Sequence, residues 1–307
     1  MSASTKYITN MSRALREEVS DVITNIDPTD TVFISNIGKG KCETTYVEWT
    51  TDSLDAAANN AQVEGTSASA SDIDAPSRTG NYTQISAKWF DISDTMEALD
   101  SVGGLTKVAY QTAKHLKELA RDMEYACINN TASSAGGSST ARELCGLKGW
   151  ITTTYYSFGE SEATTNLLTE DIFVDRLAAA WAYGGKPDMI LAPAAQKRRI
   201  SSFNGTNRIT VNTDMGDRKV INVVDYYETD FGVVRIYLAR HIAVDDTYYD
   251  WLFCLQKDKF ELLTLIPVKV ERLARTGLSQ LVQISTEYTL RSWQEKASAY
   301  VKYLYNG

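Results

Sequence analysis

The side chains that most often carry enzyme chemistry are few and scattered in this chain. It has two histidines and four cysteines: His115, His241, Cys42, Cys127, Cys145 and Cys254. No two cysteines have the spacing of a metal knuckle or of a redox motif, so we expect reduced and partly buried thiols. His115 lies in a strongly amphipathic segment, where a helical histidine at a packing boundary is expected. The residue types therefore predict no metal, no cofactor and no catalytic residue.

Two glycine-containing stretches resemble catalytic motifs but fail at defined positions. GKGKC at residues 38–42 has Ser35 and Cys42 where a phosphate-binding loop needs a glycine and a Ser or Thr. GTSAS at residues 65–69 lacks the last glycine of a serine-nucleophile elbow. The basic triplet at residues 197–199 is typical of a solvated helix face. An enzyme whose site is assembled only in space stays open as an alternative.

Most of the net charge lies in one segment. Residues 43–87 contain seven acidic residues and one basic residue, Arg78, so this segment alone carries −6 of the total charge of −8. Within it, residues 56–78 are almost all small or polar, and aromatic and β-branched residues stand on both sides. These flanks predict two strands of one β-hairpin, at residues 43–51 and 81–93. The acids either bind a basic neighbouring surface or only keep an exposed loop soluble.

Hydrophobic spacing predicts an α+β order for the rest of the chain. Helices are predicted at residues 10–25, 104–129, 170–181 and 194–203, and the second of these is about twice the average length. Residues 31–37 form a short apolar segment. Strands are predicted at residues 187–193, 219–225, 233–239, 250–263, 268–274, 282–292 and 297–304. Because strands follow helices with little strict alternation, the fold class is α+β.

Several segments match a known family in chain order. They read REEVSDVITNIDPTDTVFISNIGKGK, TYVEWTTDSL, NYTQISAKWFDIS, AYQTAKHLKELARDMEYA, GLKGWI, GGKPDMILAPAAQKRRISSF, YYETDFGVVRIYLAR and EYTLRSWQEKASAYVKYL. The patterns D-x-x-x-N-x-x-P-x-D-T-x-F, W-x-T-D-x-L and GG-x-PD are the most specific parts. Over nearly its whole length the chain resembles the major capsid proteins of tailed bacteriophages, which have the Hong Kong 97-like fold.

The resemblance implies a division of the chain. It gives an N-terminal arm at residues 1–41, an extended β-hairpin loop at 42–93, a peripheral domain at 94–168 and 259–307 with a spine helix at 104–129, and an axial domain at 169–258.

The resemblance also implies what the protein binds. Copies of the chain would form hexamers and pentamers of an icosahedral shell, with packaged DNA in non-specific proximity. Scaffolding, portal and decoration proteins are further implied partners. The protein would be made in the host cytoplasm and end in the virion. No signal peptide and no contact with a membrane are expected. A virion accessory or decoration protein stays open as an alternative.

The arm and the loop carry the residues that we expect at subunit contacts. These are Arg13, Arg16, Trp49, Asp52, Asp55, Glu64, Asp72, Asp74 and Arg78. Some members of this fold join a lysine of the loop covalently to an asparagine of a neighbour. Here Lys41 and Lys88 flank the loop and no lysine lies between them. We therefore expect packing and charge to hold the loop, without a crosslink.

Overall fold

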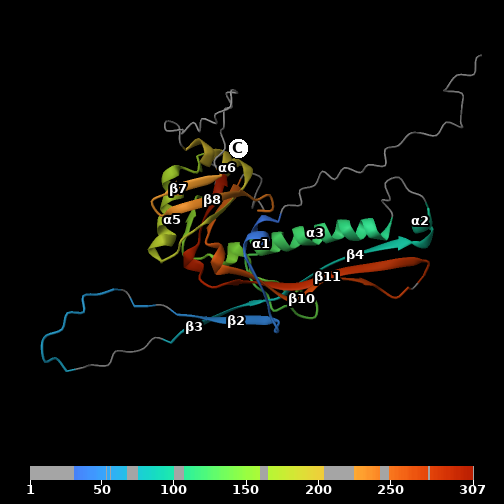
Figure 1. Cartoon of the computed structure of the whole chain (residues 1–307), viewed down its shortest axis with the longest axis horizontal. Coiled ribbons are helices and arrows are strands. Elements are labelled where there is room, and N and C mark those ends of the chain that lie inside the picture. The colour runs from blue at the N-terminus through green and yellow to red at the C-terminus, as the bar shows by residue number, and fades with distance from the viewer. Residues whose placement is uncertain are drawn as a thin grey trace, which may run out of the picture.

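Two β-sheets, two helical layers and one projecting ribbon make up the chain (Figure 1). This computed structural model describes residues 31–52, 54–55, 57–67, 75–99, 107–159, 165–203, 225–242, 249–275 and 277–306. A four-stranded sheet with the longest helix forms an elongated lobe, and a six-stranded sheet with two shorter helices forms a second lobe. This mixture of helices and largely antiparallel strands is the predicted α+β class.

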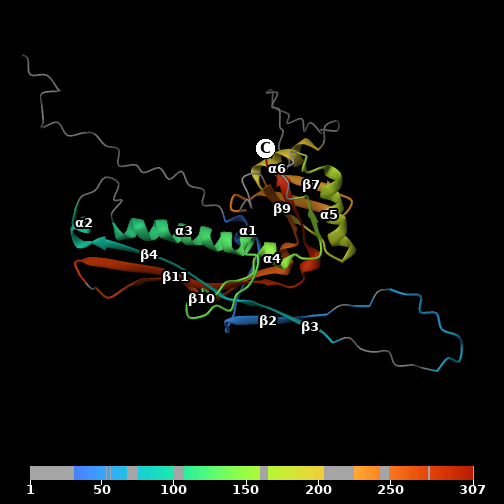
Figure 2. The same ribbon diagram turned by 180° about the vertical axis from the view of Figure 1, so that it is seen from behind.

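The four-stranded lobe is built on two long antiparallel strands. Its sheet has the order β1 (Gly38–Lys41), β10 (Phe260–Arg272), β11 (Ser279–Ser292) and β4 (Gln84–Ser93), and only the β1–β10 pair is parallel. Helix α3 (Val108–Asn129) lies along this sheet (Figures 1 and 2). Phe90 of β4 stacks on His115 of α3 with ring centroids 4.9 Å apart, as a helical histidine at a packing boundary should.

Helix α3 is shorter than the sequence pattern predicts. Lys107 is its N-cap and has an extended backbone, so the helix begins at Val108, and residues 101–106 lie outside the described part of the chain. Its 22 residues measure about 33 Å at 1.5 Å per residue. Two short helices, α2 (Asp94–Ala98) and α4 (Leu147–Trp150), stand before and after it in the sequence.

The six-stranded lobe joins strands from distant parts of the chain. Their order is β5 (Tyr155–Ser157), β12 (Ala299–Tyr305), β9 (Tyr249–Leu255), β6 (Met189–Ala192), β8 (Gly232–Leu238) and β7 (Tyr226–Thr229). Helices α5 (Glu170–Ala182) and α6 (Ala194–Ser202) pack on this sheet through Phe173, Leu177 and Ile200. Gly184 ends α5 with a φ of +81°, the left-handed conformation that favours glycine.

Two strand predictions are corrected by the structure. Residues 250–263 are two strands, β9 and β10, in different sheets, separated by the short 3-10 turn Lys257–Lys259. Residues 81–93 are the end of β3 (Ser77–Tyr82) and all of β4, separated at Thr83. Strand β8 forms a hairpin with β7. The predicted strand at residues 219–225 lies almost wholly outside the described residues.

The resemblance places the boundary between the axial and peripheral domains at residues 258 and 259. This boundary does not coincide with the division of strands between the two sheets. Strand β12 was expected beside the long helix, but it pairs with β5 and β9 in the six-stranded sheet, after the 3-10 turn Glu295–Ala297. The two lobes also share one apolar core, in which Phe33, Ile128, Met189, Phe253 and Tyr288 take part. Each lobe therefore depends on the other for burial.

A buried carboxylate fixes the start of the described chain. Residues 31–37, predicted only as a short apolar segment, contain helix α1 (Val32–Asn36). Glu124 of α3 accepts hydrogen bonds from the N–H groups of Phe33 at 2.6 Å and Ile34 at 2.9 Å, so it caps α1 from outside. Burial raises the pKa of Glu124, and its bonds to backbone N–H groups oppose that rise. The predicted helix at residues 10–25 lies outside the described residues.

Replacing this cap should destabilise the fold. In Glu124→Gln one carboxylate oxygen becomes an amide N–H facing the N–H donors of α1, so we expect the free energy of unfolding to fall by about 1–3 kcal/mol. Urea denaturation of the unassembled chain measures this. Glu143→Gln, at an exposed position, is the control and should change stability by less than about 0.5 kcal/mol. Equal stability of the two variants would contradict the role of Glu124.

Candidate assembly surface

A two-stranded ribbon carries an extended tip away from both lobes. Strands β2 (Tyr46–Thr51) and β3 pair antiparallel from Tyr46–Tyr82 to Thr51–Ser77, and no third strand joins them among the described residues. Residues 52–76 are here called the tip, and their described part, residues 52, 54–55, 57–67 and 75–76, extends beyond the body (Figures 1 and 2). The predicted hairpin is thus confirmed, with its second strand earlier than expected. A two-stranded ribbon alone is at best marginally stable in water, so its base must be held.

Asn81 holds the base of the ribbon from inside the protein. It is fully buried, and its side-chain amide donates to the carbonyl oxygens of Cys145 at 3.0 Å and Leu290 at 2.7 Å. The N–H of Cys145 donates back to the Asn81 side-chain oxygen at 2.8 Å. One side chain therefore ties β3 to the segment before α4 and to β11, and leaves none of these three backbone groups unpaired.

A partly buried ion pair secures Thr83, two residues farther along the chain. Glu287 of β11 accepts from the Thr83 hydroxyl at 2.6 Å and pairs with the Arg142 guanidinium. Arg142 also donates to the Thr83 carbonyl at 2.8 Å. Because both charges have hydrogen-bond partners, the pair can be held out of water. Thr83 is where the chain leaves β3 for β4, so this network sets the direction of the ribbon.

The inner end of the ribbon packs through aromatic rings. Trp49 is only 6% exposed and its ring lies 5.3 Å from that of Trp150. Gly80 lies beside Tyr46 on the partner strand, and a Cβ there would stand 2.6 Å from the Tyr46 ring. Trp49 therefore faces its own subunit. This corrects the prediction that its side chain contacts another copy, because strand alternation alone did not tell which face turns inward.

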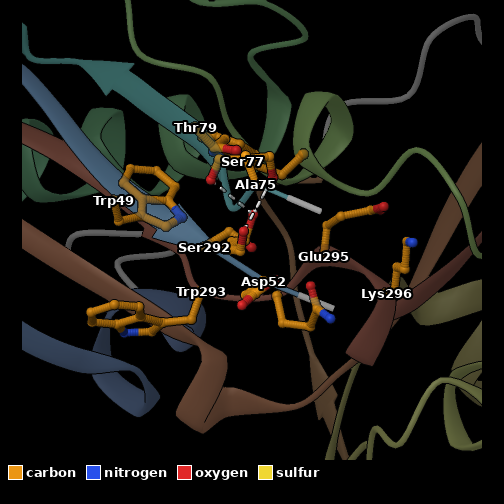
Figure 3. A pocket seen from close by; sticks show the side chains of 12 residues that line it. Trp49, Asp52, Ala75, Ser77, Thr79, Ser292, Trp293, Glu295 and Lys296 are labelled. Atoms are coloured by element: carbon orange, nitrogen blue, oxygen red, sulfur yellow. Dashed lines mark hydrogen bonds between the residues drawn. The ribbon is translucent and has the colours of Figure 1, made fainter. Parts of the chain in front are cut away.

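Beyond Trp49 a cavity of about 420 Å³ separates the ribbon from the body (Figure 3). Its walls are one face of the ribbon, including Thr51 and Ser77, and the segment from Ser292 to Lys296. Two buried polar atoms at this cavity, Trp49 Nε1 and Ser292 Oγ, have no hydrogen-bond partner within the described structure. The ribbon is thus tightly bound at one end and loosely packed at the other.

The tip presents charge and two large apolar side chains to solvent. Asp52, Asp55 and Glu64 are exposed, and Leu54 and Val63 are 99% and 80% exposed. Of the remaining predicted contact residues, Arg78 lies in the ribbon and four lie outside the described residues. Arg78 pairs with Glu48 of β2 at 2.6 Å within the same ribbon. Arg13, Arg16, Asp72 and Asp74 lie outside the described residues.

The thiols lie in environments that keep them protonated. Cys127, Cys145 and Cys254 are buried, and Cys42 is partly buried. Burial raises the pKa of Cys145 to about 11 and that of Cys254 to about 12. A thiol with such a pKa is a poor nucleophile at neutral pH. In the part of the chain that the structure describes, no group of three or more His, Cys, Asp or Glu could hold a metal, and no helix is long and apolar enough to cross a membrane.

The polar residues at the ribbon base were not predicted from the sequence. Asn81 is only the first residue of a predicted strand, and Arg142 and Glu287 belong to no motif. Their partners are 59 to 209 residues away in the chain, so no local spacing connects them. The available signal was a polar residue inside a strand pattern, which is weak by itself.

Removing the Asn81 amide should loosen the ribbon base. Asn81→Ala leaves the Cys145 N–H and the Leu290 carbonyl buried without this partner, so we expect the free energy of unfolding to fall by about 2–4 kcal/mol. Urea denaturation measures the change. Asn59→Ala in the exposed tip is the matched control and should have an effect below about 0.5 kcal/mol. A similar stability of both variants would contradict the role of Asn81.

Comparison with known proteins gives both a family and a fold. A family model described as SU10 major capsid protein matches residues 2–305. The major capsid protein of Escherichia phage Phieco32 is 34% identical over 111 residues, which are 36% of this chain and 32% of that protein. The matched segment thus spans about a third of that relative.

Solved shells of low sequence identity have the same architecture. The capsid of Myoviridae phage XM1 aligns with a TM-score of 0.63 and 13% identity, over 99% of this chain and 100% of that one. The capsid of cyanophage P-SCSP1u gives 0.63 and 11%, over 98% and 97%. The SrpI encapsulin complex of Synechococcus elongatus PCC 7942 gives 0.60 and 12%, over 95% and 93%.

These similarities confirm the Hong Kong 97-like capsid fold that the sequence resemblance implies. The family model covers all but the ends of the 307 residues, and it describes phage capsid proteins. The chain belongs to the SU10 major capsid protein family.

Proposed function

We propose that this chain is a major capsid protein whose copies assemble, by non-covalent contacts alone, into the icosahedral shell that encloses a phage genome. The observation that carries the proposal is the ribbon, which has a firmly held base and an exposed tip. A structure of this kind gains stability by packing on something outside its own subunit, and a second copy is always available in a shell. The protein would act as a structural protein and not as an enzyme.

In this proposal the tip lies across a neighbouring subunit. Its small side chains allow the backbone to approach a flat surface, and Leu54 and Val63 would supply apolar contacts. Asp52, Asp55 and Glu64, together with Asp72 and Asp74, would favour basic surface on the neighbour. Arg78 would support the tip indirectly through Glu48, and Trp49 is left out because it is already buried. Arg13 and Arg16 would contribute from the N-terminal arm, residues 1–41.

The two lobes would have different places in the shell. The four-stranded lobe would be the peripheral domain, with α3 as its spine helix. The six-stranded lobe would be the axial domain, around the five-fold and six-fold positions. Strands β5 and β12 go with the axial domain, because they complete its sheet. Scaffolding, portal and decoration proteins would be further partners, in a virion assembled after synthesis in the host cytoplasm.

A chain with a shortened tip tests whether the tip is needed for assembly but not for folding. Replacing residues 54–75 by a short Gly/Ser turn should leave the circular dichroism spectrum and thermal unfolding of the chain nearly unchanged, since no described residue of the tip belongs to either core. The wild-type chain should form rings or particles in sedimentation and negative-stain microscopy, and the shortened chain should not. Gln62→Ala is a control within the tip that should still assemble.

Three outcomes would speak against this account. Normal particles from the shortened chain would remove the role given to the tip. A wild-type chain that stays strictly monomeric at high concentration would contradict the shell function. Assembly only on a separate shell protein would favour a virion accessory protein.

Mature particles should contain no covalent links between subunits. No lysine lies between Lys41 and Lys88, so the tip has no amine to join to an asparagine of a neighbour. On a denaturing gel we expect the band of a single chain from purified particles, with and without reducing agent. A ladder of covalent multimers that survives reduction would contradict the prediction. High salt should weaken particles at the tip contacts, because exposed charges are screened.

A further inference from the structure

The six-stranded lobe has two opposite faces that differ in their chemistry. Helix α5 covers one face, where the Phe173 ring meets the Tyr227 ring edge-on at 5.4 Å. Along β8, Val234 and Ile236 are buried toward this helix. Because successive side chains of a strand point to opposite faces, Val233 and Arg235 point away from α5. The register pairs Arg235 with Tyr226 of β7, so Tyr226 shares that face. Met189 of β6 lies on the same face within the shared core, and only the part at β7 and β8, here called the outer face, is open.

The outer face presents an arginine held between two tyrosine rings. The Arg235 guanidinium lies 5.5 Å from the centre of the Tyr226 ring and 4.8 Å from that of Tyr237. Tyr226 is 60% exposed and Val233 is 54% exposed. Within the described residues no carboxylate is at ion-pair distance from Arg235. Cation–π contacts therefore hold this charge in position while its N–H donors stay available.

The opposite face presents two carboxylates on the exposed side of α5. Asp171 and Asp175 are exposed and one helical turn apart, so their side chains lie side by side. Neither forms an ion pair among the described residues. Favourable interaction with the helix dipole accounts for Asp171 in the first turn, but it fades by the second turn, where Asp175 lies. Farther along the same side, Ala178 and Ala182 leave room for close approach.

We propose that these two faces meet between neighbouring copies, with Arg235 of one subunit bound by Asp171 and Asp175 of the next. This inference rests on the proposed shell function and names a contact within it. A ring around a symmetry axis needs a head-to-tail contact, in which each copy offers two different and complementary surfaces. One sheet with a helix on one side and a fixed arginine on the other provides both surfaces.

The residue types also suit the centre of an interface. Arginine and tyrosine are enriched among the residues that contribute most to binding, and a guanidinium can pair with a carboxylate through two parallel hydrogen bonds. The exposed Glu228 shares the outer face with Arg235, so that face has no large excess of positive charge. The contact is therefore specified by the placement of three charges and not by a general attraction.

Charge reversal on each face tests the pairing. Arg235→Glu sets three carboxylates against one another, and Asp171→Arg with Asp175→Arg sets three guanidinium groups against one another. Each of these two variants should lower the yield of rings and particles at least tenfold. The variant that combines all three substitutions should recover a yield within about twofold of the wild type, because the charges are then exchanged. Yields are measured by sedimentation velocity and negative-stain microscopy at equal concentration and ionic strength.

Controls separate this contact from folding and from the shell function. Lys117→Glu makes the same change of charge on α3 of the other lobe and should assemble normally. Circular dichroism should be unchanged in every variant, since all these positions are exposed. Thermal unfolding should change only slightly, through the helix-dipole interaction that Asp171→Arg removes. Normal assembly of Arg235→Glu overturns the inference and leaves the shell function standing. Folded single-face variants that fail to assemble and are not rescued in combination also overturn the pairing. A wild-type chain that forms no particles contradicts the shell function itself.

Discussion

The geometry of the molecule depends on one buried side chain that binds three backbone groups. Asn81 pairs with the Cys145 N–H, the Cys145 carbonyl and the Leu290 carbonyl, and both of these residues are buried. A buried polar group without a partner is costly, so these bonds fix β3 against β11 within a narrow range of positions. The ion pair of Arg142 and Glu287 then fixes Thr83. The direction of the ribbon follows from Asn81 and Thr83, which are two residues apart.

The ribbon is fixed to the body at its base, so its outer end can change position more easily. The inner end is held by polar bonds and by the packing of Trp49 on Trp150. The outer end stands over a cavity in which two polar atoms have no partner among the residues that the structure describes, so its attachment to the body is weaker. Regions with few buried contacts open at low cost in free energy. A rigid base and an adaptable tip suit a lattice in which the same contact must form in rings of different size.

Local patterns could predict the elements but not the tertiary contacts that connect them. The long helix and the hairpin follow from periodicity and from the small residues between two β-rich flanks. The boundary between β9 and β10 could not be predicted, because residues 250–263 contain no glycine or proline to mark it. Glu124 gives no signal in the sequence, since its role depends on α1 lying 90 residues away. The exposed acids of the tip were predicted, whereas the inward direction of Trp49 needed the sheet register.

The order of strands has a consequence for how the protein is made. The four-stranded sheet closes only with β11, and the six-stranded sheet only with β12, which ends at Tyr305. The four-stranded sheet can therefore be completed on the ribosome only after Ser292 is synthesised, and the six-stranded sheet only after Tyr305. Pairings between distant segments form slowly and leave strand edges exposed in the meantime. A prematurely terminated chain would lack strands of both lobes, so it would be a substrate for chaperones and proteases and could not enter a growing shell.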